Sequence, residues 1–524
     1  MFKKVVAVVS AVTMCLSLFS GCGERELVSS EITGEFGKGE ISYPLQTDAE
    51  VTFWAYINPN LLKSCPNLNE SAYAADLREQ TGINVTFVSP AMGTEDESFA
   101  LLFSSDDIPD IIGDGASKDV TGNGADGAIE EGFLFDMTDY IEDYAPNYYK
   151  VLKENPFFDR SAKSNSGRYW TFANMSHTVP YQGAIVRKDW LDDLGLPLPE
   201  TIEEWYITLK AFKEKKGATA PFAYLNSTFF KEGVLESAYD TSTSFYLDGD
   251  TIKFGPLDAS YKEFVKEMAK WYAEGLIDKN IASSDSKSLD AKFLNGETGM
   301  TIGYASSSIG RWMQSKKADS PMNISAVKFP VLNKGDEPAI YGGNINTYND
   351  YASISANSKN KELAMRLLDY SFSEEGMLLH DYGREGVSYV MEDGKPKFTD
   401  VVLNNPDGLS ISEALYYYSQ QGPGWLQNDA YLQQIKLPQQ FEATKIWEKD
   451  TSHQLPRFSI AGKENKEFTD IMLDVETYIS ETVLSVICGR LPISTLDEMD
   501  ATLKSMNIER AIQIQQEAYN IFVK

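Results

Sequence analysis

The apolar positions divide the chain into one leading apolar run and two later stretches in which short strands alternate with helices. Residues 5–18 are almost all apolar, whereas 23–48 are polar and glycine-rich with no period. The apolar segments 51–55, 83–87 and 109–112 predict strands, and the segments between them have helical patterns. This strand–helix–strand order favours a parallel α/β sheet.

A second α/β stretch begins near residue 184. The segment 184–186 predicts a strand, and Thr201 with Glu204 forms a capping box that starts a helix ending near residue 215. A further helix after Asp258 has a continuous apolar face. Helices are also predicted at 361–372, 495–506 and 508–522.

The first 22 residues predict export. Lys3 and Lys4 precede the apolar run, which is too short to span a bilayer and ends in small residues, as in a signal peptide over 1–21. Residues 19–22 resemble a bacterial lipobox, so we expect lipid on Cys22 and a protein held on the extracellular face of the cytoplasmic membrane. Residues 22–48 would then be a flexible tether. The alternative is an ordinary signal peptide with a coincidental cysteine.

Composition excludes several classes of protein. The 524 residues suffice for two or more domains, and a hydrophobic content of 42% permits large cores. A formal charge of −30 excludes nucleic acid as a partner and disfavours a polyanionic ligand. The three histidines lack metal-ligand spacing, so we expect no metal and no cofactor. Cys65 and Cys488 are expected to be free thiols, although a disulfide between them is the alternative.

Seven motifs then occur in an order that points to a known family. They lie at 187–197, 199–205, 271–277, 293–300, 329–335, 355–364 and 373–376. Together they resemble the extracellular solute-binding proteins of ABC sugar importers, family 1, and within these the large LipO-type lipoproteins of Gram-positive bacteria.

The resemblance implies an α/β fold of the two-lobed, periplasmic-binding-protein-like type II, with discontinuous lobes joined by hinge strands. It implies an N-terminal lobe at 49–180 and 345–384 and a C-terminal lobe at 181–344 and 385–524. Gly183 falls at the first crossover, where a glycine can serve a hinge or a plain turn. Relatives often bind calcium after the capping-box helix, but 213–221 has no run of oxygen ligands, and we predict no calcium there.

The same resemblance implies a binding protein that captures a carbohydrate, an oligosaccharide, between closing lobes and delivers it to ABC permease subunits. We expect a monomer and no enzymatic activity. The alternatives are a receptor for peptides or other small solutes and a carbohydrate-active enzyme. No pair of carboxylates is singled out by spacing, which weighs against a glycosidase.

A sugar site needs aromatic platforms for C–H faces and polar groups for hydroxyls. The candidate ligand-binding residues are Tyr56, Asn58, Asp114, Trp170, Tyr181, Tyr304, Trp312, Asn344, Tyr417 and Trp425. Packing in the core is the alternative for each aromatic residue. Trp54 and Trp271 are assigned to the core, and Arg187 to an ion pair with Asp189 or Asp193. The sequence does not decide whether Arg311 or Arg384 binds the carboxylate of a uronate.

Overall fold

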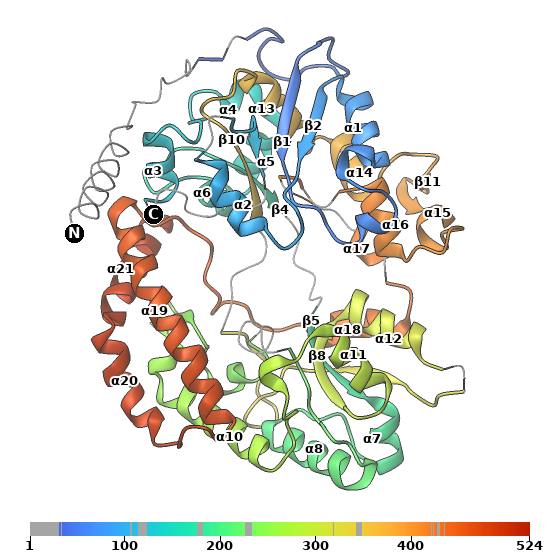
Figure 1. Cartoon of the computed structure of the whole chain (residues 1–524), viewed down its shortest axis with the longest axis vertical. Helices are drawn as coiled ribbons and strands as arrows, with labels where there is room; N and C mark the ends of the chain where they lie inside the picture. Colours follow the sequence, from blue (N-terminus) through green and yellow to red (C-terminus); the bar gives the residue numbers. More distant parts are fainter. Residues whose placement is uncertain are drawn as a thin grey trace, which may run out of the picture.

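The protein is described by a computed structural model, in which two lobes face each other along the longest axis (Figure 1). One hydrophobic core is built from residues within 45–175 and 351–379, and we call this part the N-terminal lobe. The core of the C-terminal lobe is built from residues within 184–340 and 443–522. The described residues are 31–32, 34–104, 107–113, 123–175, 182–225, 233–317, 319–341, 348–420, 422, 424–426, 430–433 and 435–524.

A five-stranded sheet forms the centre of the N-terminal lobe, with strand order β2-β1-β3-β10-β4. Strand β1 is parallel to β2 and β3, which confirms the predicted parallel arrangement. Strand β10 arrives from the other end of the chain and pairs antiparallel with β3 and β4. The bounds are β1 (Glu50–Trp54), β2 (Asn84–Val88), β3 (Ile111–Ile112), β4 (Phe172–Met175) and β10 (Tyr348–Ile354).

The alternating apolar residues fix the register of this sheet. Phe53 lies opposite Phe87, and their ring centroids are 5.5 Å apart. Trp54 is buried, as predicted. Since β1 and β3 are parallel, the segments that follow Trp54 and Ile112 leave the same edge of the sheet, where ligands bind in open α/β folds.

Helices surround the N-terminal sheet. The last four of them belong to the region after residue 373. Their bounds are α1 (Ala72–Thr81), α2 (Glu95–Leu102), α3 (Gly124–Glu130), α4 (Ile141–Tyr144), α5 (Pro146–Glu154), α6 (Pro156–Ser161), α13 (Lys361–Tyr370), α14 (Glu374–Tyr382), α15 (Asp400–Leu403), α16 (Ile411–Tyr418) and α17 (Ala430–Gln433).

The C-terminal lobe contains an antiparallel sheet with strand order β8-β5-β9. Two short hairpins, β6–β7 in this lobe and β11–β12 in the region after residue 385, were not predicted. The strand bounds are β5 (Gln182–Arg187), β6 (Phe245–Asp248), β7 (Thr251–Phe254), β8 (Met300–Tyr304), β9 (Ile324–Val327), β11 (Tyr389–Glu392) and β12 (Lys395–Phe398).

Helices of the C-terminal lobe include three long ones near the end of the chain (Figure 1). The sequence did not predict α19, which is the longest helix among the described residues. The bounds are α7 (Lys188–Leu194), α8 (Ile202–Lys216), α10 (Ala259–Ala273), α11 (Ser286–Leu294), α12 (Gly310–Ser315), α18 (Pro438–Ile446), α19 (Gly462–Ile487), α20 (Thr495–Ser505) and α21 (Ile508–Phe522).

Local signals predicted the starts and faces of these helices. The capping box of Thr201 and Glu204 is present at the start of α8, where each side chain satisfies a free backbone N–H of the other residue. Trp271 on α10 is fully buried, as predicted. Arg187 donates to Asp189 over 2.8 Å, which confirms its structural assignment.

Gly183 is required by packing in the C-terminal lobe. A Cβ atom on Gly183 would lie 2.5 Å from Cδ1 of Trp447, a fully buried residue whose indole donates to the carbonyl of Ala184. The close approach of the indole explains a glycine here without reference to a hinge.

The region after residue 385 differs from the expected lobe boundary. A small core around Tyr389, Phe398 and Leu415 belongs to this region, and α16 contacts α1 of the N-terminal lobe. Arg384 forms an ion pair with Asp76 of α1 over 2.6 Å, which fixes this region to that lobe. Figure 1 shows α15 and α16 in the same half of the molecule as α1, and the chain returns to the C-terminal lobe only at α18.

The segment before β1 is also different from the flexible tether that we expected at 22–48. Arg366 of α13 is fully buried and donates to the carbonyl oxygens of Gly37 and Gly39. Glu362 accepts the backbone N–H groups of Glu35 and Phe36 over 2.7 and 2.9 Å. Residues 34–39 are therefore bound to α13, because two buried charged side chains find their partners in this backbone.

Cys65 and Cys488 are free thiols, as predicted. Within the described part of the chain, we find no helix with the length and apolar character that a membrane span requires.

Candidate functional site

A cavity of about 290 Å³ lies between the two lobes. This volume is close to the lower end of the range for small-molecule sites, roughly 300–1,000 Å³. The N-terminal lobe contributes the end of β3, helices α2 and α3, Trp170 and Tyr351, and the C-terminal lobe contributes the segment before α19 and the start of that helix. A ligand in this cavity would therefore contact both lobes.

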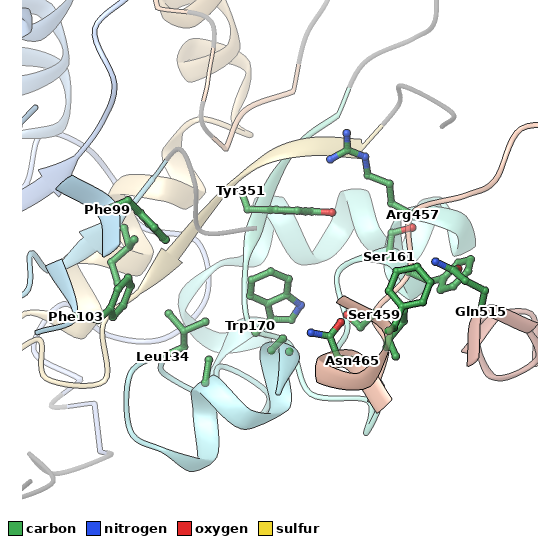
Figure 2. A pocket seen from close by; sticks show the side chains of 17 residues that line it. Phe99, Phe103, Leu134, Ser161, Trp170, Tyr351, Arg457, Ser459, Asn465 and Gln515 are labelled. Carbon is green, nitrogen blue, oxygen red and sulfur yellow. The ribbon is translucent and has the colours of Figure 1, made fainter. Parts of the chain in front are cut away.

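Aromatic side chains form much of the cavity wall. Trp170 and Tyr351 lie side by side at its centre with ring centroids 5.2 Å apart, and Phe99 and Phe103 lie to one side (Figure 2). The C-terminal lobe adds Phe468. Such walls provide the flat apolar faces on which the C–H face of a sugar ring can stack.

Three polar atoms in this cavity are buried and have no hydrogen-bond partner. They are Nε1 of Trp170, Oγ of Ser161 and Nε of Arg457. Trp170 and Ser161 are themselves buried, at 7% and 6% exposure. Buried polar groups are nearly always hydrogen-bonded, so unpaired groups around a cavity indicate a site for a polar ligand.

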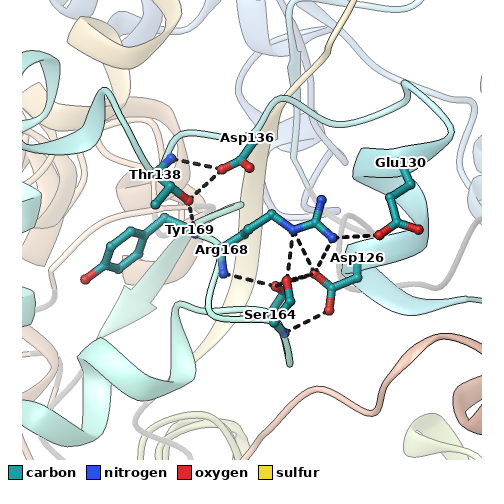
Figure 3. A network of polar contacts seen from close by, with 8 residues as sticks. Asp126, Glu130, Asp136, Thr138, Ser164, Arg168 and Tyr169 are labelled. Atoms are coloured by element: carbon teal, nitrogen blue, oxygen red, sulfur yellow. Dashed lines mark hydrogen bonds and ion pairs between the residues drawn. The ribbon is translucent and has the colours of Figure 1, made fainter.

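A polar network beside the cavity positions the segment that carries Trp170 (Figure 3). Asp126 of α3 accepts hydrogen bonds from Ser164 over 2.6 Å and from Arg168 over 3.1 Å. Arg168 also pairs with Glu130 over 2.9 Å. These contacts fix the segment 164–168 to α3, which itself lines the cavity.

The Asp126 carboxyl is a stable anion in this network. Burial alone raises its pKa, but hydrogen bonds from Ser164 and Ser166 and the charge of Arg168 outweigh burial, so the pKa lies below its ordinary value. Arg168 pairs with both Asp126 and Glu130, and the network supports the cavity wall from α3.

Of the ten candidate ligand-binding residues, Trp170 is the one that lines this cavity among those described. The structure corrects two others. Trp312 is 1% exposed, stacks on Phe293 at 4.2 Å and donates to Asp290. Trp425 is also buried, and its indole donates to Asp381 over 3.0 Å. Both indoles pack in cores because a nearby carboxylate accepts the N–H group.

Four further candidates lie elsewhere. Tyr304 ends β8 and is 39% exposed. Tyr417 packs edge-on against the neighbouring Tyr418. Tyr56 packs against Trp54, and Asn58 accepts the backbone N–H of Asn60 in a local turn. None of these four lines the cavity, so their role in binding stays a prediction. Asp114, Tyr181, Asn344 and Cys22 lie outside the described residues.

Sequence reasoning missed Arg457, Phe458 and the start of α19. They follow an extended segment without periodicity, so no pattern marked them. Residues 455–461 contain an arginine and an aromatic residue but no acid, and because acid-free stretches of this length are common in the chain, their composition gave no signal either.

No group of three or more His, Cys, Asp or Glu side chains that could hold a metal occurs in the described part of the chain. At the end of α8, where we predicted no calcium, Lys216 pairs with Asp193 of α7 over 2.7 Å.

Two α/β lobes that share one cavity define a two-lobed solute-binding protein. Comparison with known proteins agrees with this class. The model of the bacterial extracellular solute-binding protein family matches residues 66–378. The chain belongs to this family.

Individual relatives are distant but extensive matches. The chain is 24% identical to the fructooligosaccharide ABC transporter substrate-binding protein FusA of Streptococcus pneumoniae, over 71% of this chain and 70% of FusA. It is 24% identical to lipoprotein LipO of Bacillus subtilis, over 66% of this chain and 69% of LipO. The crystal structure of the alginate-binding protein AlgQ2 without calcium superposes with a TM-score of 0.75 at 23% identity, covering 91% of this chain and all of AlgQ2.

Proposed function

We propose that this protein is the lipid-anchored substrate-binding protein of an ABC transporter, which captures an oligosaccharide between its lobes and delivers it to the permease. The observation that carries the proposal is the cavity itself, with aromatic walls and unpaired N–H and O–H groups contributed by both lobes. Relatives named for fructooligosaccharide and alginate support a carbohydrate ligand.

Closure of the lobes follows from the position of the cavity. A ligand that contacts both walls binds the closed arrangement better than an open one, and this difference in affinity shifts the equilibrium towards closure. Hydrolysis of the ligand finds no support, since a glycosidase needs two carboxylates and the described lining residues include neither Asp nor Glu.

Purified protein lacking residues 1–22 should be stabilised against heat by one class of oligosaccharide in a glycan panel. A ligand at 100 times its dissociation constant stabilises the folded state by about 2.7 kcal/mol, which gives a shift of several degrees. Differential scanning fluorimetry measures the shift, with a peptide panel as the control. Stabilisation by peptides and by no glycan would refute the carbohydrate proposal.

Replacing Cys22 with alanine should release the protein into the medium without changing its affinity for ligand. The thiol of Cys22 is the proposed site of lipid attachment, and stable anchoring requires more than one acyl chain, all of which this variant would lose. Fractionation of cells followed by immunoblotting measures the distribution. A variant that stays in the membrane fraction would contradict the lipid anchor at Cys22.

A further inference from the structure

The charged side chain in the described wall of the interlobe cavity has a sign opposite to the net charge of the whole chain. The chain contains 77 Asp and Glu against 47 Lys and Arg. Among the described residues, seventeen line the cavity, and these include Arg457 and no acid. The described lining of this interlobe cavity therefore lacks acidic side chains, although the chain as a whole is strongly acidic.

The unpaired polar groups of the cavity are donors. The indole N–H of Trp170 and the guanidinium N–H groups of Arg457 can only donate, and the hydroxyl of Ser161 can donate as well. None of the three buried atoms has an acceptor. A ligand that satisfies them must therefore present acceptor oxygens, and an anionic oxygen forms stronger bonds with such donors than a neutral hydroxyl does.

Arg457 is the cation available to such a ligand. Three other arginines already have a carboxylate partner. Arg168, Arg311 and Arg384 form ion pairs with Asp126, Asp290 and Asp76. Arg457 forms no ion pair with any described residue, and Figure 2 shows it on the side of the cavity to which the hydroxyl of Tyr351 points. The guanidinium group stays charged at all physiological pH values.

A second hollow adjoins the cavity and shares Phe458 and Ser459 with it. Its described lining contains the basic side chains of Arg160, Lys163 and Lys524 and no acidic side chain. Lys163 is paired with Asp159 over 2.7 Å, which leaves the side chains of Arg160 and Lys524 as the other two basic groups of this lining. The basic character of the lining thus continues beyond the cavity along the interface of the lobes.

From these observations we infer that the ligand is a carboxylated glycan, in which the carboxylate of a uronate residue pairs with Arg457. The planar guanidinium matches a carboxylate with two parallel hydrogen bonds. The aromatic wall contacts the sugar ring, and Trp170 and Ser161 donate to its oxygens. The negative charge of the whole chain opposes a long polyanion, so a short acidic oligosaccharide fits best. This inference rests on the proposed carbohydrate-binding function.

The test uses isothermal titration calorimetry on the full mature chain. The probes are short oligomers of galacturonate, glucuronate and mannuronate, each compared with its own carboxyl-reduced, neutral form. At least one acidic oligomer should bind about 10-fold or more tightly than its neutral form, since hydrogen bonds between charged partners are the stronger ones.

Arg457→Gln should weaken binding of the acidic oligomer about 10- to 100-fold and change the affinity for the neutral form by less than about 3-fold. Arg457→Lys keeps the charge but loses the paired geometry, and its affinity should lie between those of the parent and Arg457→Gln. Arg311→Gln is the matched control, because Arg311 pairs with Asp290 outside the cavity, and it should bind as the parent does.

Each outcome separates the two levels of the proposal. Binding of neutral oligomers without preference for any acidic form would overturn the inference about charge and leave the carbohydrate-binding function intact. An equal loss for acidic and neutral forms in both Arg457 variants would also overturn it. Failure of every glycan, acidic or neutral, would instead refute the proposed function. Thermal unfolding of each variant checks that it is folded. If Arg457→Gln does not fold, the comparison of acidic and neutral oligomers is made with Arg457→Lys.

Discussion

Replacing Trp170 with alanine should weaken ligand binding by at least about 100-fold, because an aromatic platform at the centre of a buried site carries a large share of the binding energy. Trp170 lines the cavity beside Tyr351, and its indole N–H is unpaired. Trp170→Phe keeps a ring but removes the donor, so its loss of ligand affinity should be smaller, about 10-fold. Calorimetry with the stabilising glycan of the panel measures both effects.

Trp312 provides the matched control for this prediction. It is equally large but lies in the core of the C-terminal lobe, stacked on Phe293. Trp312→Ala should lower the free energy of unfolding by about 3–5 kcal/mol, since it removes a buried aromatic side chain. Trp312→Phe should stay folded and bind ligand as the parent does. An unchanged affinity in Trp170→Ala, or a large loss of affinity in Trp312→Phe, would contradict the assignment of Trp170 to the site.

Replacing Arg366 with alanine should lower the free energy of unfolding by about 3–5 kcal/mol, which is the usual cost of breaking a buried charged contact. Arg366 is fully buried, donates to Gly37 and Gly39, and lies 5.3 Å from the ring of Tyr144. Without the guanidinium, both carbonyls lose a donor and residues 34–39 lose one of their two attachments to α13, the other being Glu362. Urea unfolding measures the stability, and limited proteolysis measures exposure of the segment.

Two variants sharpen this second prediction. Arg366→Met restores much of the volume but no donor. Its decrease in the free energy of unfolding should therefore be smaller than that of Arg366→Ala. Arg510→Ala removes an exposed ion pair with Glu467 and should cost less than about 1 kcal/mol. If Arg366→Ala unfolds within 1 kcal/mol of the parent and its N-terminal segment resists protease as before, the segment is held by other contacts.

The attachment of residues 34–39 changes how the proposed anchor would work. A loose linker over 22–48 would leave the lobes free at a large distance from the membrane. With 34–39 bound to α13, the part of the linker before it is much shorter, and the reach of a chain grows with its length. The proposed anchor would therefore hold the N-terminal lobe close to the membrane.

The amino-acid sequence by itself determined the features that depend on neighbouring residues. Apolar alternation at Val51–Phe53 and Val85–Phe87 set the parallel strands, because side chains two residues apart share one face of a strand. The capping box at Thr201 set the start of α8, because both hydrogen bonds lie within four residues. The ordered motifs over 187–376 identified the family, which the match to residues 66–378 confirms.

Only the tertiary structure decided which residues form the cavity. Trp170, Tyr351 and Arg457 are far apart in the chain and meet because β10 returns to the N-terminal sheet and the segment before α19 approaches it from the other lobe. The roles of Trp312 and Trp425 were also decided there, since each indole packs where Asp290 or Asp381 can accept its N–H group. Residue type suggests what a side chain can bind, but long-range packing determines whether a ligand or the core receives it.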